Sequence, residues 1–336
     1  MMPKDNNMVV HNGIGEIGEE LKGGISIVIP VFNEFKNVPL LAAEIDEVMR
    51  IVNIPWECIW VDDCSTDKSW ECITELGQNH QGIRLQRNSG QSTALMAGID
   101  HAANNVILTL DADLQNDPHD IPAFLQSLST EVDVVAGYRV ARQDELVRRK
   151  IPSKIANFLS RKITGVKVKD LGCTMRIFRK DVIRRSRLLG EMHRVILVHF
   201  ALSGAKIVEI PTNHRKRIHG ESKYGLERTL KFIADLLLAK LMNIITNKPL
   251  YFFGSTSLIT LFVSMGLSLL AITLRVSGIK DYIDTSLIVG SIVLLSTSTL
   301  LFCLGLLAEV LLRVFHTRPN ITQYSISNFH NINHGN

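Results

Sequence analysis

Short apolar runs alternate with amphipathic segments through the first 140 residues of the chain. Uncharged runs rich in β-branched residues and leucine are typical of buried strands, whereas apolar positions every three or four residues are typical of helices packed on a sheet. The pattern predicts strands at 25–29, 57–61, 83–85, 106–110, 133–137 and 205–210, and helices at 38–52, 68–79 and 92–102. We therefore predict an α/β fold with a parallel sheet and helices on both faces.

Two later segments, 252–274 and 285–308, contain no charged residue. The shorter one forms about 35 Å of helix at about 1.5 Å per residue, enough to cross a hydrocarbon core of about 30 Å. A core helix of a soluble protein seldom stays uncharged over this length, so we predict two transmembrane helices. The amphipathic stretch that precedes them is expected to lie along the membrane surface, with an ordinary packed helix as the alternative.

Basic residues flank the outer ends of the two predicted spans: Lys231, Lys240, Lys248, Arg313 and Arg318. The loop between the spans balances two basic residues with two acidic ones. Because cytoplasmic flanks are enriched in lysine and arginine, and the N-terminal residues lack the apolar core of a signal peptide, we expect the α/β domain and both termini in the cytosol.

The five cysteines show neither a CxxC pair nor a metal-ligand spacing, so reduced thiols are expected. The net charge is only +4, but basic residues far outnumber acidic ones from Arg142 to Arg187. Such a patch suits nucleic acid, anionic lipid or a phosphorylated substrate. The membrane spans downstream favour membrane lipid and a lipid substrate, and we expect no nucleic-acid partner.

Carboxylates follow the predicted strands at their carboxyl ends. They are Glu34, Asp62, Asp63, Asp111 and Asp113. Taken singly, each is more often a turn former or a helix cap. Because ligands of open α/β sheets bind where the strands end, their convergence on one sheet edge predicts a ligand site.

The spacing of Asp111 and Asp113 indicates a metal. Two carboxylates one residue apart, with the amide of Gln115 continuing the spacing, offer the oxygen ligands that Mg²⁺ or Mn²⁺ prefers. Such an ion would neutralise a leaving diphosphate. Asp62 and Asp63 would then be free to hydrogen-bond a base or a ribose.

Four motifs of the first half resemble the nucleotide-sugar half of glycosyltransferase family 2, which has the GT-A (Rossmann-like) fold. They are PVFNE (30–34), VDDCSTDKS (61–69), NSGQSTALMAG (88–98) and LDADLQ (110–115).

Four later motifs narrow the resemblance to polyprenyl-phosphate glycosyltransferases, the group that holds dolichol-phosphate-mannose synthases and the undecaprenyl-phosphate formamido-arabinose and glucosyl transferases. They are RRKIPSKIANFLSRKITG (148–165), KDLGCTMRIFRK (169–180), EIP (209–211) and RIHGESKYG (217–225).

The resemblance covers about residues 24–318 and implies the reaction. It implies an inverting hexosyl- or pentosyltransferase that moves a sugar from a nucleotide-diphosphate donor, a UDP-sugar, to undecaprenyl phosphate. The product would serve modification of lipid A or another envelope glycan. The resemblance further implies a multi-pass protein of the bacterial inner membrane that assembles as a homotetramer.

The resemblance also assigns roles to individual residues. The nucleotide-sugar positions are Pro30, Val31, Asn33, Glu34, Asp62, Asp63, Asp111, Arg217 and Lys223. The lipid-phosphate positions are Arg139, Arg149, Ser153 and Arg176. The metal positions are Asp111, Asp113 and Gln115. The catalytic positions are Asp113, Asp170, Arg139 and Arg217.

The expected domains are an N-terminal extension (1–23), the GT-A domain (24–225), juxtamembrane helices (226–249), the two spans (250–313) and a cytosolic tail (314–336). The tail has too little apolar surface to fold alone. We expect it to add a strand to a neighbouring subunit, with a disordered terminus as the alternative.

Two other functions remain open. A processive polysaccharide synthase would share the first half, but it would carry a QxxRW motif and usually more spans, and this sequence has neither. A catalytically inactive, membrane-anchored relative would keep the fold without the chemistry. The presence of Asp111, Asp113, Arg149 and Arg217 weighs against that alternative.

Overall fold

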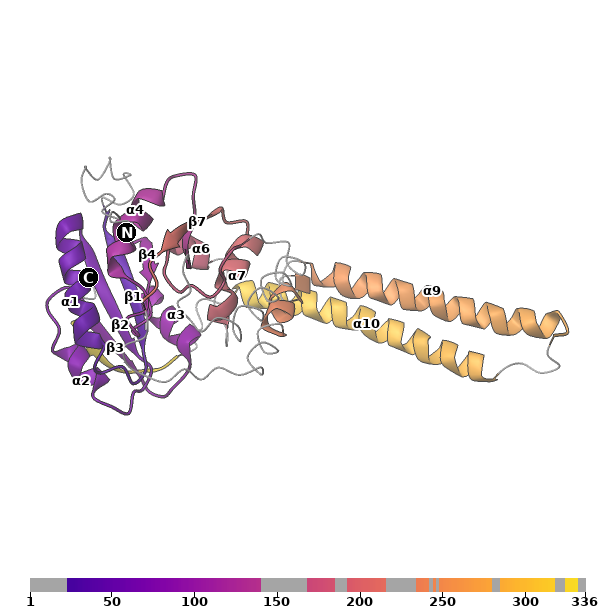
Figure 1. The fold of residues 1–336 in the computed structure, drawn as a ribbon. Helices are drawn as coiled ribbons and strands as arrows, with labels where there is room; N and C mark the ends of the chain where they lie inside the picture. Colours follow the sequence, from indigo (N-terminus) through magenta and orange to yellow (C-terminus); the bar gives the residue numbers. More distant parts are fainter. Residues whose placement is uncertain are drawn as a thin grey trace, which may run out of the picture. The chain divides into compact units, whose positions relative to one another are not determined.

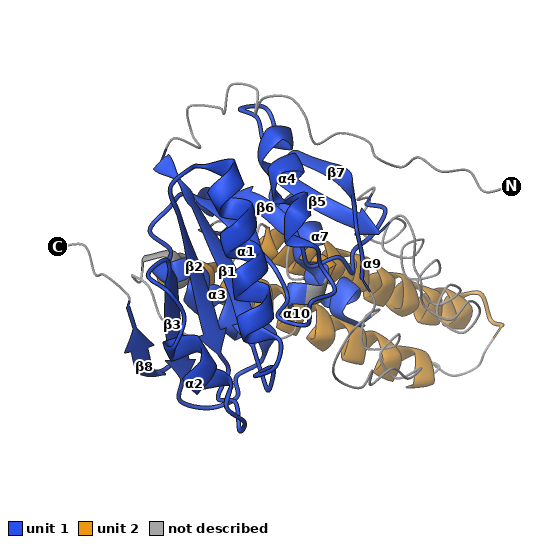
Figure 2. Cartoon of the chain, turned by 60° about the vertical axis from the view of Figure 1, so that its left-hand side comes forward, with its two compact units in different colours: residues 1–239, 322–336 blue, residues 240–321 orange. Residues whose placement is uncertain are grey.

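The computed structural model describes residues 23–139, 168–184, 192–215, 234–241, 244–245, 248–279, 285–317 and 324–331. The chain divides into two compact units (Figure 2). The first contains residues 1–239 and 322–336 and carries the sheet. The second contains residues 240–321 and carries two long helices.

Within the described residues, eight strands of the first unit form one sheet in the order β7-β5-β6-β4-β1-β2-β3-β8 (Figure 1). Their bounds are β1 Ile25–Val31, β2 Trp56–Asp62, β3 His80–Leu85, β4 Val106–Thr109, β5 Val134–Arg139, β6 Arg176–Arg179, β7 Ile207–Thr212 and β8 Ile326–His330. The central strands β4, β1, β2 and β3 are parallel, as predicted. The sheet as a whole is mixed, because β6 and β8 run antiparallel to their neighbours.

Helices cover both faces of the sheet. The α-helices of this unit whose bounds are fully described are α1 Val38–Val52, α2 Ser69–Thr74, α3 Gln91–His101, α4 Ile121–Ser127, α6 Lys180–Arg184 and α7 Ile196–Leu202. Alternate residues of β1 enter two separate cores: Ile27 and Ile29 pack on the side of α1, and Val28 packs on the side of α3. All three are fully buried. Burial on both faces explains the unbroken apolar run that predicted this strand.

The helix predicted at 68–79 ends at Thr74. The strand predicted at 83–85 begins earlier, at His80, because His80 pairs with Cys58 of β2 and its ring nitrogen accepts a hydrogen bond from Trp60. Residues 75–79, which the pattern placed in the helix, instead form the turn that leads into β3.

The C-terminal strand lies in the sheet of its own chain. β8 pairs antiparallel with β3, with Ile83 opposite Phe329. The expected pairing of the tail with a neighbouring subunit stays a prediction. Tyr324 and Ile326 pack against the core on the α3 side, and the Tyr324 hydroxyl lies 3.1 Å from Asp100 Oδ2. Without β8, β3 would be an open edge of the sheet. The tail belongs to the same chain, so it reaches this edge at high effective concentration.

The second unit is an antiparallel hairpin of α9, Pro249–Val276, and α10, Thr285–Thr317 (Figure 1). Small residues recur at seven-residue intervals along both facing sides: Ser257, Ser264 and Ala271 on α9, and Ser291, Ser298 and Gly305 on α10. Ser257 and Ser298 each donate to the other's main-chain carbonyl, at 2.9 and 2.8 Å. Small residues let two helices approach closely, and the seven-residue period keeps one seam facing the partner.

Both helices are long and apolar enough to cross a membrane, with mean hydropathies of 2.1 and 2.3. Only 17% and 11% of their most apolar segments are buried. A core helix of a soluble protein would bury most of this surface, so the outward apolar faces agree with the predicted membrane spans.

Candidate functional site

A cleft of about 200 Å³ opens at the carboxyl ends of β1 and β4. Its lining residues are Pro30, Val31, Phe32, Glu34, Asp63, Gln91, Ala94, Asp111, Ala112 and Asp113. Six of the predicted site residues therefore come together from three strand ends, where an open α/β sheet binds its ligands.

Asp111 and Asp113 bring two carboxylates to this cleft. The Gln91 side chain, at the start of α3, donates to Asp111 Oδ1 at 2.8 Å. The main-chain N–H of Gln115 donates to Asp113 Oδ1 at 3.2 Å. Gln115 therefore orients Asp113 through its main chain. The role of its side chain as a metal ligand stays a prediction.

The backbone between these residues takes an unusual conformation. Leu114 has a φ of 60° and is buried. A bulky residue is rarely found in this left-handed region, and such outliers cluster at functional sites. Asn33 has a similar φ of 59°, and its side-chain oxygen accepts from the Thr66 N–H at 2.8 Å, which ties the end of β1 to the loop after β2.

Asp62 and Asp63, which we predict to hydrogen-bond a base or a ribose, also make hydrogen bonds within the chain. Asp62 is fully buried, accepts from the Ser65 N–H at 3.0 Å and lies 3.1 Å from Arg84 Nε. Asp63 lines the cleft, but its two oxygens accept the N–H groups of Ser89 and Gly90 at 2.7 and 2.8 Å. Burial raises the pKa of both carboxyl groups. Both acids therefore hold the loops around the cleft, and Asp63 also faces it.

Arg139 and Asp170 form a bidentate ion pair, with Nε–Oδ2 at 2.7 Å and Nη2–Oδ1 at 2.9 Å. Arg176 is 3% exposed, its Nη2 donates to the Leu171 carbonyl at 3.3 Å, and burial lowers the pKa of its guanidinium. The predicted contact of Arg176 with a lipid phosphate does not fit this burial. Its charge acts instead on the nearby carboxylates of Asp111 and Asp170.

Four predicted site residues lie outside the described residues: Arg149, Ser153, Arg217 and Lys223. Their roles stay predictions.

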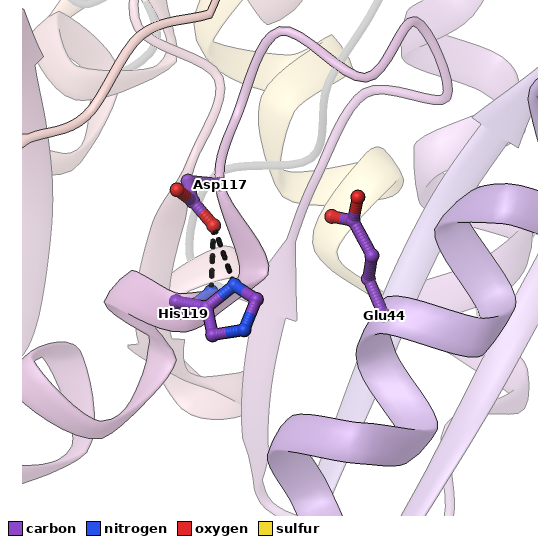
Figure 3. A group of neighbouring side chains, drawn as sticks. All are labelled: Glu44, Asp117 and His119. Atoms are coloured by element: carbon purple, nitrogen blue, oxygen red, sulfur yellow. Dashed lines mark hydrogen bonds and ion pairs between the residues drawn. The ribbon is translucent and has the colours of Figure 1, made fainter.

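Sequence reasoning missed a cluster made by Glu44 of α1, Asp117 and His119 (Figure 3). One donor atom from each lies within 4.8 Å of the others, a spacing that suits a metal. Arg215 Nη1 lies 2.8 and 2.7 Å from the two oxygens of Glu44, and Nη2 lies 2.6 Å from Asp117 Oδ1. A guanidinium therefore already neutralises these acids. The residues are up to 171 positions apart, and no local motif links them.

Comparison with known proteins identifies relatives of the chain. The family model described as glycosyl transferase family 2 matches residues 26–187. Dodecaprenyl-phosphate galacturonate synthase of Rhizobium johnstonii is 38% identical over 306 residues, covering 87% of this chain and 88% of the relative. Undecaprenyl-phosphate 4-deoxy-4-formamido-L-arabinose transferase of Pectobacterium atrosepticum is 35% identical over 255 residues, covering 75% and 76%.

Two solved structures share their fold with about two thirds of this chain. Glucosyl-3-phosphoglycerate synthase from Mycobacterium tuberculosis, in complex with Mn²⁺, UDP and phosphoglyceric acid, has a TM-score of 0.51 at 18% identity, covering 68% of this chain and 82% of its own. Mannosyl-3-phosphoglycerate synthase from Rubrobacter xylanophilus also has a TM-score of 0.51, at 14% identity, covering 67% and 75%. The predicted GT-A fold is confirmed.

Proposed function

Because this chain belongs to glycosyltransferase family 2, with polyprenyl-phosphate sugar transferases among its relatives, we propose that it transfers a sugar from a UDP-sugar to undecaprenyl phosphate. The product would serve modification of lipid A or another envelope glycan. One observation carries the proposal: Glu34, Asp63, Asp111 and Asp113 line one cleft in a chain that also has two exposed apolar helices.

The donor set of the cleft suits a divalent ion. Asp111 and Asp113 present carboxylate oxygens, the ligands that Mg²⁺ and Mn²⁺ prefer. A bound ion would neutralise the diphosphate of the donor. Gln91 and the Gln115 N–H each donate to one of these carboxylates and fix their orientation.

The acceptor determines what else the chain must supply. A phosphate monoester is already an anion, so it needs little deprotonation, and positioning and charge neutralisation carry most of the reaction. We assign Arg149 and Ser153 to the lipid phosphate, and Arg217 and Lys223 to the donor diphosphate. In-line attack of the phosphate oxygen on the anomeric carbon, with departure of UDP, inverts that carbon.

Arg139 and Asp170 support the acceptor end of the site. Asp170 holds the Arg139 guanidinium in a fixed bidentate pair and also accepts the Gly172 N–H at 3.0 Å. A guanidinium fixed in this way is preorganised for a phosphate that approaches it. Arg176 is buried, and its charge offsets the negative charge of Asp111 and Asp170.

We assign the chain to the bacterial inner membrane as a multi-pass protein, with the GT-A domain and both termini in the cytosol. Tyr251 at the start of α9 is 77% exposed, and Lys248 Nζ lies 5.7 Å from the centre of its ring. A tyrosine with a neighbouring lysine is typical of the membrane–water interface on the cytoplasmic side. We also retain the homotetramer that the resemblance implies.

The test incubates the purified full-length chain with undecaprenyl phosphate and a panel of UDP-sugars. The panel includes the galacturonate and formamido-arabinose donors named by the two relatives. We expect a polyprenyl-phosphate sugar with one of them. UDP binding without transfer to any acceptor would support an inactive relative, and a polymeric product would support a processive synthase.

Arg149→Ala separates the two halves of the proposed site. We expect it to weaken use of undecaprenyl phosphate and to leave UDP affinity almost unchanged. A parallel fall in donor affinity would contradict the assignment of Arg149 to the acceptor.

A further inference from the structure

Arg215 follows β7 and joins three separate segments of the first unit. Its guanidinium contacts both oxygens of Glu44 on α1 and one oxygen of Asp117, all within 2.8 Å. Burial lowers the pKa of Arg215, but the hydrogen bonds with Glu44 and Asp117 outweigh that effect and raise it. Figure 3 shows Glu44 on its helix facing Asp117 and His119. Nη1 contacts Glu44 and Nη2 contacts Asp117, a fork between two carboxylates that the single nitrogen of lysine does not reproduce.

The main chain around Arg215 holds the turn that carries Asp113. The Arg215 N–H donates to the Gln115 carbonyl at 2.9 Å, and Asn116 and His214 form an isolated antiparallel bridge. Asn213 adds a bond from its side-chain amide to Asp117 Oδ2 at 2.9 Å. Residues 115–117 are therefore bound along their length by residues 213–215.

This turn needs an outside support. Leu114 lies in the left-handed region, with a φ of 60°, and such a conformation persists only where the surroundings fix it. The conformation places the Gln115 N–H on Asp113 Oδ1. The Arg215 side chain anchors residues 213–215 to Glu44 and Asp117. Its loss would free this segment, loosen its main-chain bond to Gln115 and let the turn that orients Asp113 relax.

We propose that Arg215 is a positioning residue, which clamps the Leu114 turn so that Asp113 stays aimed into the cleft for the metal–diphosphate. Arg215 also keeps Glu44, Asp117 and His119 from offering a second set of donors to the cation. The inference rests on the proposed function, since it assumes that Asp111 and Asp113 hold a divalent ion with UDP.

The experiment measures Mn²⁺ affinity at saturating UDP on the full-length protein, by calorimetry or by the Mn²⁺ electron paramagnetic resonance signal. Loss of a residue that supports a metal ligand typically costs 10- to 100-fold in affinity, so we expect Arg215→Ala to weaken Mn²⁺ binding by at least about 10-fold. Arg215→Lys should fall between Ala and the unaltered protein, because it keeps the charge but loses the fork.

Lys206→Ala is the matched control. Lys206 precedes β7 and pairs with Glu131 at 2.7 Å on an exposed surface, so its loss should leave Mn²⁺ affinity unchanged. Arg215→Lys serves as the main variant if Arg215→Ala fails to fold. Unaltered Mn²⁺ affinity in a folded Arg215 variant would overturn the inference, as would absence of Mn²⁺ binding in the unaltered protein. If Mn²⁺ binding depends on Arg215 but the protein transfers no sugar, only the proposed function is overturned.

Discussion

Arg84 Nε lies 3.1 Å from Asp62 Oδ2, and the same guanidinium donates to the Ser65 carbonyl at 3.2 Å. Asp62 is fully buried, whereas the Arg84 side chain is 27% exposed. One arginine therefore offsets a buried charge and holds the loop that follows β2. The next residue, Asp63, lines the cleft, so this pair couples the edge of the sheet to the site.

Arg84→Leu should make stability depend on pH. Burial raises the pKa of Asp62, while the charge of Arg84 opposes that rise. Without Arg84 the folded-state pKa rises further above the unfolded value of about 3.9. A raised carboxyl pKa means that the folded state binds the proton more tightly, so stability is lost as pH rises through that pKa and recovered as pH falls.

The measurement is the midpoint of urea unfolding for Arg84→Leu as pH rises from about 4, near the unfolded pKa of about 3.9. Adding Asp62→Asn to the variant should flatten the dependence of the midpoint on pH. A smaller dependence due to Asp63 should remain, because burial also raises the pKa of Asp63. A profile for Arg84→Leu parallel to that of the unaltered protein would contradict the argument.

Removing residues 324–336 should weaken UDP binding without abolishing it. β8 pairs with the strand that carries Arg84, and the Ser327 hydroxyl donates to the Arg84 carbonyl at 3.0 Å. If the loosening of Arg84 costs about as much as one weak hydrogen bond, about 0.5–1 kcal/mol, UDP affinity falls several-fold. Calorimetric titration with UDP measures it.

Removal of residues 332–336 alone, which leaves β8 intact, is the control and should have no effect. Equal UDP affinity for the two truncations would show that β8 does not support the cleft. Mass measurement of both truncations in detergent would also test whether the tail contributes to the predicted tetramer.

Asp113→Asn should lower turnover by at least about 10²-fold, on the scale of lost electrostatic stabilisation. The substitution keeps the size of the side chain and an oxygen that can accept the Gln115 N–H, so it removes charge more than structure. Steady-state kinetics with added Mg²⁺ or Mn²⁺ measure it, and chelation should abolish transfer by the unaltered chain.

Glu131→Gln is the control for Asp113→Asn, because Glu131 is an exposed carboxylate paired only with Lys206 among the described contacts. Full activity in a chelator, or an equal effect of the two substitutions, would contradict the metal assignment.

The sequence predicted the sheet centre and the cleft because β1, β2 and β4 are buried on both faces and stop at acidic residues. It missed β6, where Arg176 and Arg179 flank only two apolar residues. It missed β8 as part of the same sheet, because a short polar strand shows its place only through the edge it joins. Nor does the VDD motif reveal that Asp62 turns toward Arg84, 22 residues later, while Asp63 faces the cleft. The direction in which each aspartate points depends on the pairing of β2 with β3, which sets Asp62 opposite Arg84.

Ser298→Leu should destabilise the membrane hairpin. Ser298 is 4% exposed, and its hydroxyl donates to the Ser257 carbonyl at 2.8 Å. A leucine side chain at this point of the seam would force α9 and α10 apart, at a cost of about 1–3 kcal/mol for overpacking. Ser298→Ala loses only the hydrogen bond, about 0.6 kcal/mol for such bonds in a membrane protein.

Ser296→Leu is the matched control, since Ser296 lies one half-turn away on an exposed face of the same helix. Ser296→Leu adds the same leucine side chain to the surface that we expect to face lipid, where an extra apolar group is tolerated. Thermal unfolding in detergent should therefore rank Ser298→Leu well below Ser298→Ala, and Ser298→Ala slightly below Ser296→Leu. Equal melting temperatures for the two leucine variants would mean that the seven-residue series of small residues does not hold the hairpin together.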